Sequence, residues 1–307
     1  MKKSNLKGFT LVELMVAIAL GLLIVAAATQ LFITGQVSLN LQKAMADIQD
    51  NSNFGINFIA SDLRKANYGA DQPIINSTTK NGGIVLSTDN FPNDLAGKPR
   101  VTLLSKAAVE EASSALTSTA SDQLVVQYYT PENTIDCEGN NVLAGNFIVQ
   151  RYFIDSGNLK CDSGQYLKDK PAVTVTYALT GFGSNAQTIL KNVEYMRILL
   201  AVSEDNDTAT GSQSNLPVDG LAQKNLRYIG IGDYPKTGSL PRIRGVQLGI
   251  LMRANESVSS TTELANKNKA TFRVLDTDVT LKTKDTIFLH QVVAQTIALR
   301  NAMGAAS

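Results

Sequence analysis

The sequence is poor in the residues that most often carry catalysis. Its 307 residues include no tryptophan, two cysteines and one histidine, His290. A site built from several histidines is therefore excluded, and a serine–histidine–aspartate triad is disfavoured because His290 stands among apolar residues, as a packed or surface histidine does. A membrane-anchored periplasmic enzyme would need convergent catalytic groups, and the sequence has no phosphate-binding loop, nucleophile elbow or metal-ligand spacing. We therefore expect no enzyme and no cofactor.

Charge is scarce and unevenly placed. Charged residues make up 18% of the chain and the net charge is +1, so nothing suggests direct nucleic-acid binding through bulk charge. Residues 1–8 contain Lys2, Lys3 and Lys7 and no acidic residue, whereas the rest of the chain is slightly acidic. A basic excess confined to the first residues is typical of a targeting segment. We predict that residues 1–8 are a leader peptide.

A long uncharged segment follows the leader. No charged residue occurs from Leu14 to Val37, a run of 24 residues that, at about 1.5 Å each in a helix, can cross a bilayer core of about 30 Å. The preceding lysines favour a cytoplasmic start, so a single pass would leave the head in the periplasm. A cleavable signal peptide ending near Ala26–Ala28 and an ordinary signal anchor are the alternatives.

Glu13 lies inside this apolar run, where a carboxylate is costly and suggests a function. If the chain is cut after Gly8, the new amino terminus at Phe9 lies about one helical turn from Glu13. In a filament, that amine could pair with Glu13 of a neighbouring subunit and neutralise both charges. An interfacial glutamate that reaches toward water is the alternative interpretation.

Helical spacing continues beyond the apolar run. A stripe of apolar or small residues recurs at steps of three, four and seven: Leu41, Met45, Ile48, Gly55, Ile59, Leu63 and Ala66. Asn67 and Gly69 tolerate a left-handed backbone and predict the end of the helix. We expect one helix over residues 9–66, with residues 9–36 as its transmembrane and assembly half and residues 37–69 as its amphipathic half.

Residues 70–307 are predicted to form a β-rich periplasmic head. Strand-like runs separated by turn residues occupy 84–86, 123–129, 146–154, 172–177, 193–202, 245–253 and a hairpin at 271–281. Residues 109–120 are predicted as a short helix, and 288–299 as either helix or strand. Because strands follow one another without helices between them, we expect an α+β fold in which the long helix packs on antiparallel sheet.

Two smaller predictions concern the head. An even number of cysteines in an exported chain favours a disulfide between Cys137 and Cys161, with two buried free thiols as the alternative. Asp205 and Asp207 lie in a polar stretch and are a weak calcium candidate, but the later carboxylate of an EF-hand loop is missing. A solvated loop is favoured there, so no metal is predicted.

The segment Gly8-Phe9-Thr10-Leu11-Val12-Glu13-Leu14 resembles the prepilin motif of type IV pilins and type II secretion pseudopilins. The resemblance implies cleavage between Gly8 and Phe9 by a prepilin peptidase and N-methylation of Phe9. It also implies that the apolar segment is retained after cleavage.

Further segments resemble the PilW family of minor pilins. They are Phe58–Gly69, Tyr152–Cys161, Asn192–Leu200, Gly245–Arg253 and the ending Thr296–Asn301. The family implies a subunit that works with other minor pilins, the major pilin, an inner-membrane assembly platform and a tip adhesin. It implies a head in the periplasm before assembly, a pilus at the cell surface afterwards, and roles in twitching motility, adhesion and often DNA uptake. A J-type pseudopilin of a type II secretion system is the alternative.

Overall fold

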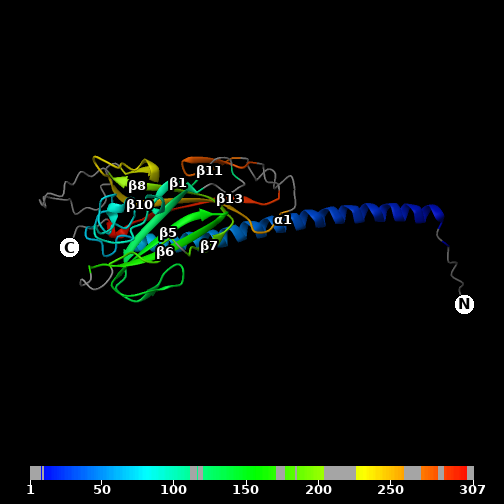
Figure 1. The fold of residues 1–307 in the computed structure, drawn as a ribbon. Helices are drawn as coiled ribbons and strands as arrows, with labels where there is room; N and C mark the ends of the chain where they lie inside the picture. The colour runs from blue at the N-terminus through cyan, green and yellow to red at the C-terminus, as the bar shows by residue number, and fades with distance from the viewer. Residues whose placement is uncertain are drawn as a thin grey trace, which may run out of the picture.

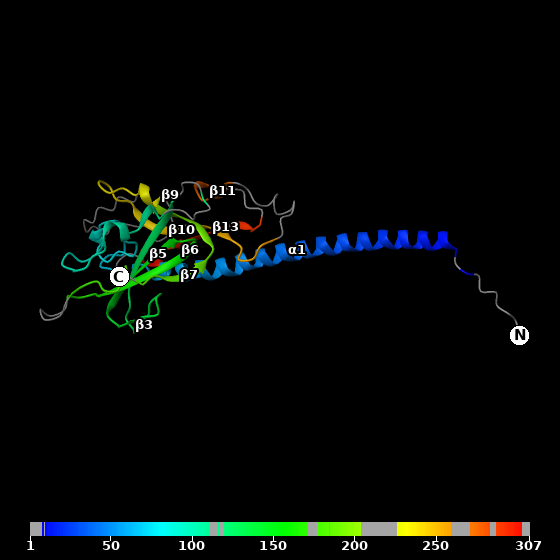
Figure 2. The same ribbon diagram turned by 45° about the vertical axis from the view of Figure 1, so that its right-hand side comes forward.

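The computed structural model describes residues 8, 10–110, 116, 120–170, 177–183, 185–203, 226–258, 271–282 and 287–302. It has one long helix, α1 (Leu11–Lys65), and a head made of two main antiparallel sheets. In Figures 1 and 2 the first half of α1 projects away from the head, and the second half lies against the sheets. The predicted α+β fold is confirmed.

Helix α1 begins and ends with identifiable caps. The Thr10 hydroxyl accepts a hydrogen bond from the Glu13 N–H at 3.3 Å, which satisfies one free donor of the first turn. At the other end, Asn67 and Gly69 have φ angles of 68° and 73°, so the left-handed stop predicted from the sequence is present. The predicted stripe is also confirmed: its members from Leu41 to Ala66 are buried, except for half-buried Met45.

The first sheet has the strand order β1-β2-β5-β6-β7, and the second has the order β13-β10-β8-β9. The first contains β1 (Lys106–Glu110), β2 (Ser121–Tyr129), β5 (Asn146–Asp155), β6 (Asn158–Leu167) and β7 (Gln187–Lys191). The second contains β13 (His290–Ala298), β10 (Arg242–Arg253), β8 (Val193–Ser203) and β9 (Arg227–Gly230). Two hairpins are β3 (Thr134–Ile135) with β4 (Asn141–Val142), and β11 (Thr271–Val274) with β12 (Thr277–Thr280). Short 3₁₀ helices are η1 (Thr88–Asn90), η2 (Val101–Leu103), η3 (Ile231–Asp233) and η4 (Arg300–Ala302).

The two sheets and the second half of α1 enclose one large core. Ile59 of α1, Ile148 of β5 and Leu248 of β10 are all fully buried in it. The sheets meet where β2 lies beside β8, since the Ser121 hydroxyl accepts a hydrogen bond from the Met196 N–H there. Helix α1 packs against β7, at one edge of the first sheet, and against β10 and β13, at one side of the second sheet. The head is thus built around the amphipathic half of the helix.

Some strand predictions were incomplete. Val109 and Glu110, predicted as the start of a short helix, belong to strand β1. The predicted strand 84–86 is reduced to a single bridge from Ile84 to Val126. Within residues 288–299, predicted as either helix or strand, His290–Ala298 form strand β13. Most of the predicted strand 172–177 and the acidic stretch with Asp205 and Asp207 lie outside the described residues.

Strands β6, β7 and β9 were not predicted, and β6 shows why. It runs through Cys161, Asp162, Ser163 and Gly164, which carry no apolar alternation. Nevertheless Asp162 and Ser163 are buried at 0% and 1% exposure, and the Asp162 carboxylate is paired with Arg151 at 3.1 Å. A strand whose buried positions are polar has no periodic signal in the sequence.

Candidate functional site

The exposed first half of α1 is the most unusual surface of the protein. From Leu11 to Asn40 no residue is buried, although most of the side chains are apolar. By length and composition, α1 can cross a membrane. An apolar surface of this size is not stable in water, so it has to be covered by lipid or by other protein chains.

The predicted processing site lies at the start of this surface. Gly8 is exposed, and an added Cβ there would meet no atom within 4 Å. The structure therefore gives no packing reason for a glycine at this position. Glu13 is exposed in the first turn of α1, within the apolar surface. Phe9, the predicted new amino terminus, lies outside the described residues.

Asp62 fastens the last turns of α1 to the first sheet. Its carboxylate is almost fully buried and accepts hydrogen bonds from the hydroxyls of Tyr128, at 3.0 Å, and Tyr152. The Lys65 ammonium lies 3.3 Å from the same carboxylate. Burial first, and then the charge of Asp62, raises the pKa of both tyrosines, so both hydroxyls remain protonated donors at neutral pH. In the sequence, Asp62 stands out only as part of the Phe58–Gly69 segment, and no residue near it indicates this role.

A pair of asparagines closes the end of the helix. The Asn301 side-chain N–H groups donate to the carbonyl oxygens of Arg64, Lys65 and Ala66 at distances of 3.1 to 3.3 Å. These are carbonyls that a helix end leaves without partners. In return, the Asn67 amide donates to the Asn301 carbonyl oxygen at 3.1 Å. We call Asn67 and Asn301 the asparagine clamp; it joins the stem to the last turn of the head.

The neighbourhood of the clamp requires close backbone approach. The Gly83 N–H donates to the Asn67 side-chain oxygen at 3.0 Å. A Cβ at Gly83 would lie 2.1 Å from the Asn67 nitrogen, so no other residue fits there without a backbone shift. The end of α1 is therefore held on two sides, by Asn301 of η4 and by Gly83, just before the bridge from Ile84 to β2.

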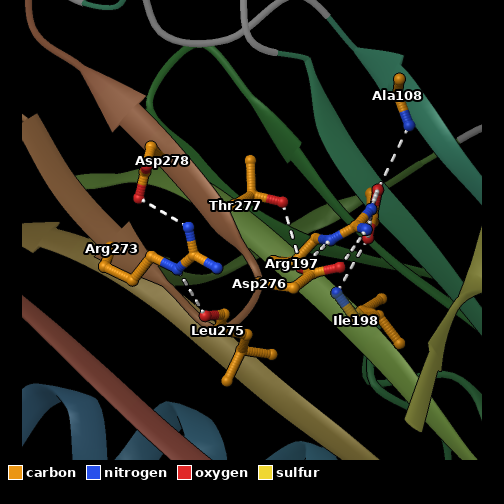
Figure 3. A network of polar contacts seen from close by, with 9 residues as sticks. Ala108, Arg197, Ile198, Arg273, Leu275, Asp276, Thr277 and Asp278 are labelled. Carbon is orange, nitrogen blue, oxygen red and sulfur yellow. Dashed lines mark hydrogen bonds and ion pairs between the residues drawn. The ribbon is translucent and has the colours of Figure 1, made fainter.

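Arg197 of β8 ties the two sheets and a hairpin together (Figure 3). Its guanidinium lies 3.3 Å from Asp122 of β2 and 2.7 Å from Asp276, in the turn between β11 and β12. Asp122 is nearly fully buried and also accepts from the N–H groups of Ile198 and Ala108. Burial raises the pKa of Asp122, against the lowering effects of these N–H groups and of the Arg197 charge. This network holds the head rigid where the sheets meet.

The structure contains the disulfide between Cys137 and Cys161, with Cα atoms 6.2 Å apart. Cys161 is buried in β6, while half-buried Cys137 lies in the loop that joins β3 to β4. The bond therefore anchors an exposed loop to the core. In the chain-entropy account, a loop of this length contributes roughly 3 kcal/mol to stability.

His290, predicted from its apolar neighbours to be either a packed or a surface residue, is packed. It is buried, and its Nε2 atom lies 3.1 Å from a carboxylate oxygen of Glu194 in β8. The Arg253 guanidinium lies 3.8 Å from the other oxygen of Glu194. Among the described residues, no group of three histidine, cysteine or acidic side chains could hold a metal ion. The histidine is thus a buried residue at the start of β13, packed against Glu194 of the same sheet.

Comparison with known proteins identifies the family of the chain. Among solved structures, a type IV-like pilin from Thermus thermophilus is similar at 11% identity, over 83% of this chain and 98% of that chain, with a TM-score of 0.38. No curated protein matches the chain. Residues 3–29 match the prokaryotic N-terminal methylation motif, and residues 151–301 match the family described as Type IV Pilus-assembly protein W. The second match ends at the asparagine clamp, and together the two matches identify the chain as a PilW-like type IV pilin.

Proposed function

We propose that this protein is a minor pilin that co-assembles with other minor pilins to prime pilus assembly and sits at or near the pilus tip. The observation that carries the proposal is the exposed apolar half of α1, from Leu11 to Asn40, in which the structure shows no buried residue. Such a stem can be held in the inner membrane first and in a bundle of stems later. Through the pilus, the protein would support twitching motility, adhesion and often DNA uptake.

Before assembly, the protein would be a single-pass membrane protein with its head in the periplasm. The prepilin peptidase would cut between Gly8 and Phe9, and Phe9 would be methylated. Its amine would then pair with Glu13 of a neighbouring stem, because an unpaired carboxylate among apolar side chains is costly. The assembly platform, the major pilin and a tip adhesin would be the further partners.

Replacing Gly8 by arginine should block processing. Gly8 makes no contact that an added side chain would disturb, so the Gly8→Arg chain should still fold. We expect it to accumulate at the unprocessed length and to lack N-methylated Phe9, which mass spectrometry of membrane extracts would measure. Asn5→Arg is the matched control, because it adds the same charge elsewhere in the leader. Gly21→Arg is not suitable, because it adds that charge inside the apolar segment. Normal processing of Gly8→Arg would contradict the cleavage site.

The co-assembly itself can be tested by purification of the full-length protein from membranes. With a tag after Ser307, we expect other minor pilins and the major pilin to be recovered in amounts comparable to the tagged chain. The partners would be identified by mass spectrometry. Recovery of secretion-system pseudopilins in their place would overturn the pilus assignment, and recovery of no pilin-like partner would overturn co-assembly.

A further inference from the structure

In the part of the chain that the structure describes, four strands form the edges of the two main sheets, and three of them carry features that discourage further pairing. Strands β1 and β7 have five residues each, contain lysine and have an irregular register with their neighbours. Strand β9 has four residues and begins with arginine. Short length, charge and irregularity are the usual protections of a sheet edge. These three edges are thus protected against an added strand.

Strand β13 has none of these protections. It has nine residues, contains no proline, lysine, arginine or acidic residue, and pairs with β10 in an unbroken register from His290 to Ala298. Ala294, Thr296 and Ala298 are exposed. A long, regular and uncharged edge is a ready template for another strand.

The hydrogen bonds at both ends of β13 show which backbone groups point outward. The Leu299 N–H donates to Arg244, and the Ala254 N–H donates to Leu289. In an antiparallel pair, bonded residues alternate with unbonded ones, so the odd-numbered residues of β13 face β10. The even-numbered residues then present their N–H and C=O groups to the open side. The structure gives no partner for these groups among its described residues at four positions: Val292, Ala294, Thr296 and Ala298.

Strand β13 runs in the same direction as the stem. Near the start of β13, the Leu289 carbonyl accepts a hydrogen bond from the Ala254 N–H. Asn255, which follows Ala254, donates its N–H to Asp47 of α1. Beyond its end, Asn301 bonds to the carbonyls at residues 64–66 of α1. Figure 1 shows β13 alongside the helix in this orientation. Antiparallel pairing of β13 between two copies would therefore point their stems in opposite directions, and both could not enter one membrane from the same side.

We propose that the open edge of β13 accepts an extended segment from the head of a different minor pilin as an additional strand of the second sheet. This rests on the co-assembly proposed above. The segment should be uncharged and apolar at alternate residues, because one face of β13 presents Val293 and Ile297 to the core around α1. On the other face, Ala294 and Thr296 are exposed, so the matching side chains of the added strand can be polar.

A proline at Ala294 tests the proposal directly. It removes one outward N–H while sparing the bonds to β10, and proline is tolerated where the N–H of an edge strand faces solvent. In full-length protein purified from membranes, we expect Ala294→Pro to lower recovery of the partner minor pilin about tenfold or more, with little change in melting temperature. Ala294→Thr is the matched control, because it keeps the N–H and should retain the partner.

Hydrogen exchange supplies the second readout. The amides of Val292, Ala294, Thr296 and Ala298 should exchange readily in the purified protein alone, and about tenfold or more slowly in the complex with its partner. A complex that forms while these amides still exchange readily, or one that Ala294→Pro leaves intact, would overturn the inference and leave co-assembly standing. Thr296→Cys chains that crosslink to each other in membranes would assign the edge to a second copy and also overturn it. If the wild-type chain recovers no minor pilin, both proposals fail.

Discussion

Asp62→Ala should destabilise the head by about 3 kcal/mol, the lower end of the effect of losing two hydrogen bonds to a buried charged group at about 1.5–3 kcal/mol each. The Tyr128 hydroxyl would be left buried without its acceptor, whereas Tyr152 can turn toward Gln150, 2.8 Å away. For a head of this size, the melting temperature should fall by about 6–12 °C. Tyrosine fluorescence can follow unfolding in detergent, since the chain has nine tyrosines and no tryptophan.

Two controls separate the effect of losing the buried carboxylate from a general effect of changing the helix that carries it. Asp50→Ala removes an exposed carboxylate from the same helix and should change stability by less than about 0.5 kcal/mol. Tyr128→Phe should cost about 1–2 kcal/mol in the wild-type chain and clearly less in the Asp62→Ala chain, because its acceptor is already gone. Equal costs of Tyr128→Phe in both backgrounds would show that the hydroxyl and the carboxylate do not act together.

The stem was predictable because its signals are local. The uncharged run, the stripe from Leu41 to Ala66 and the stop at Asn67 each depend on residues a few positions apart, and helices are made of such contacts. The same locality explains what was missed. Asp62 was visible as a polar residue next to Leu63, but its acceptor role depends on tyrosines 66 and 90 residues further along.

The asparagine clamp shows the same limit at greater separation. Asn67 and Asn301 are 234 residues apart, and nothing near either residue in the sequence indicates the other. The ending Thr296–Asn301 was noticed only as part of a resemblance. The structure supplies its physical basis, because Asn301 is held where it can bond three carbonyls at the end of α1. Strand order has the same origin: β13 is an edge strand because it pairs with β10 and with no other strand in the described part of the chain.

Glu13→Ala should have the largest effect on assembly and almost none on the head. Glu13 is exposed in the first turn of α1, far along the helix from the first buried residue, Leu41. In a bundle of stems, its carboxylate would neutralise a neighbouring amine, and loss of such a pair leaves an unpaired charge in an apolar environment. We expect recovery of partner pilins from membranes to fall about tenfold or more, which corresponds to at least about 1.4 kcal/mol.

The controls for Glu13 use the same helix. Ser38→Ala changes a polar residue in the stem without removing charge and should leave partner recovery unchanged. Glu13→Asp keeps the charge on a shorter side chain, so it should restore part of the recovery that Glu13→Ala loses, whereas Glu13→Gln should not, because it cannot neutralise an amine. The melting temperature of the head should stay the same in all of these chains. Partner recovery that is equal in Glu13→Ala and wild-type protein would show that the carboxylate does not pair between stems.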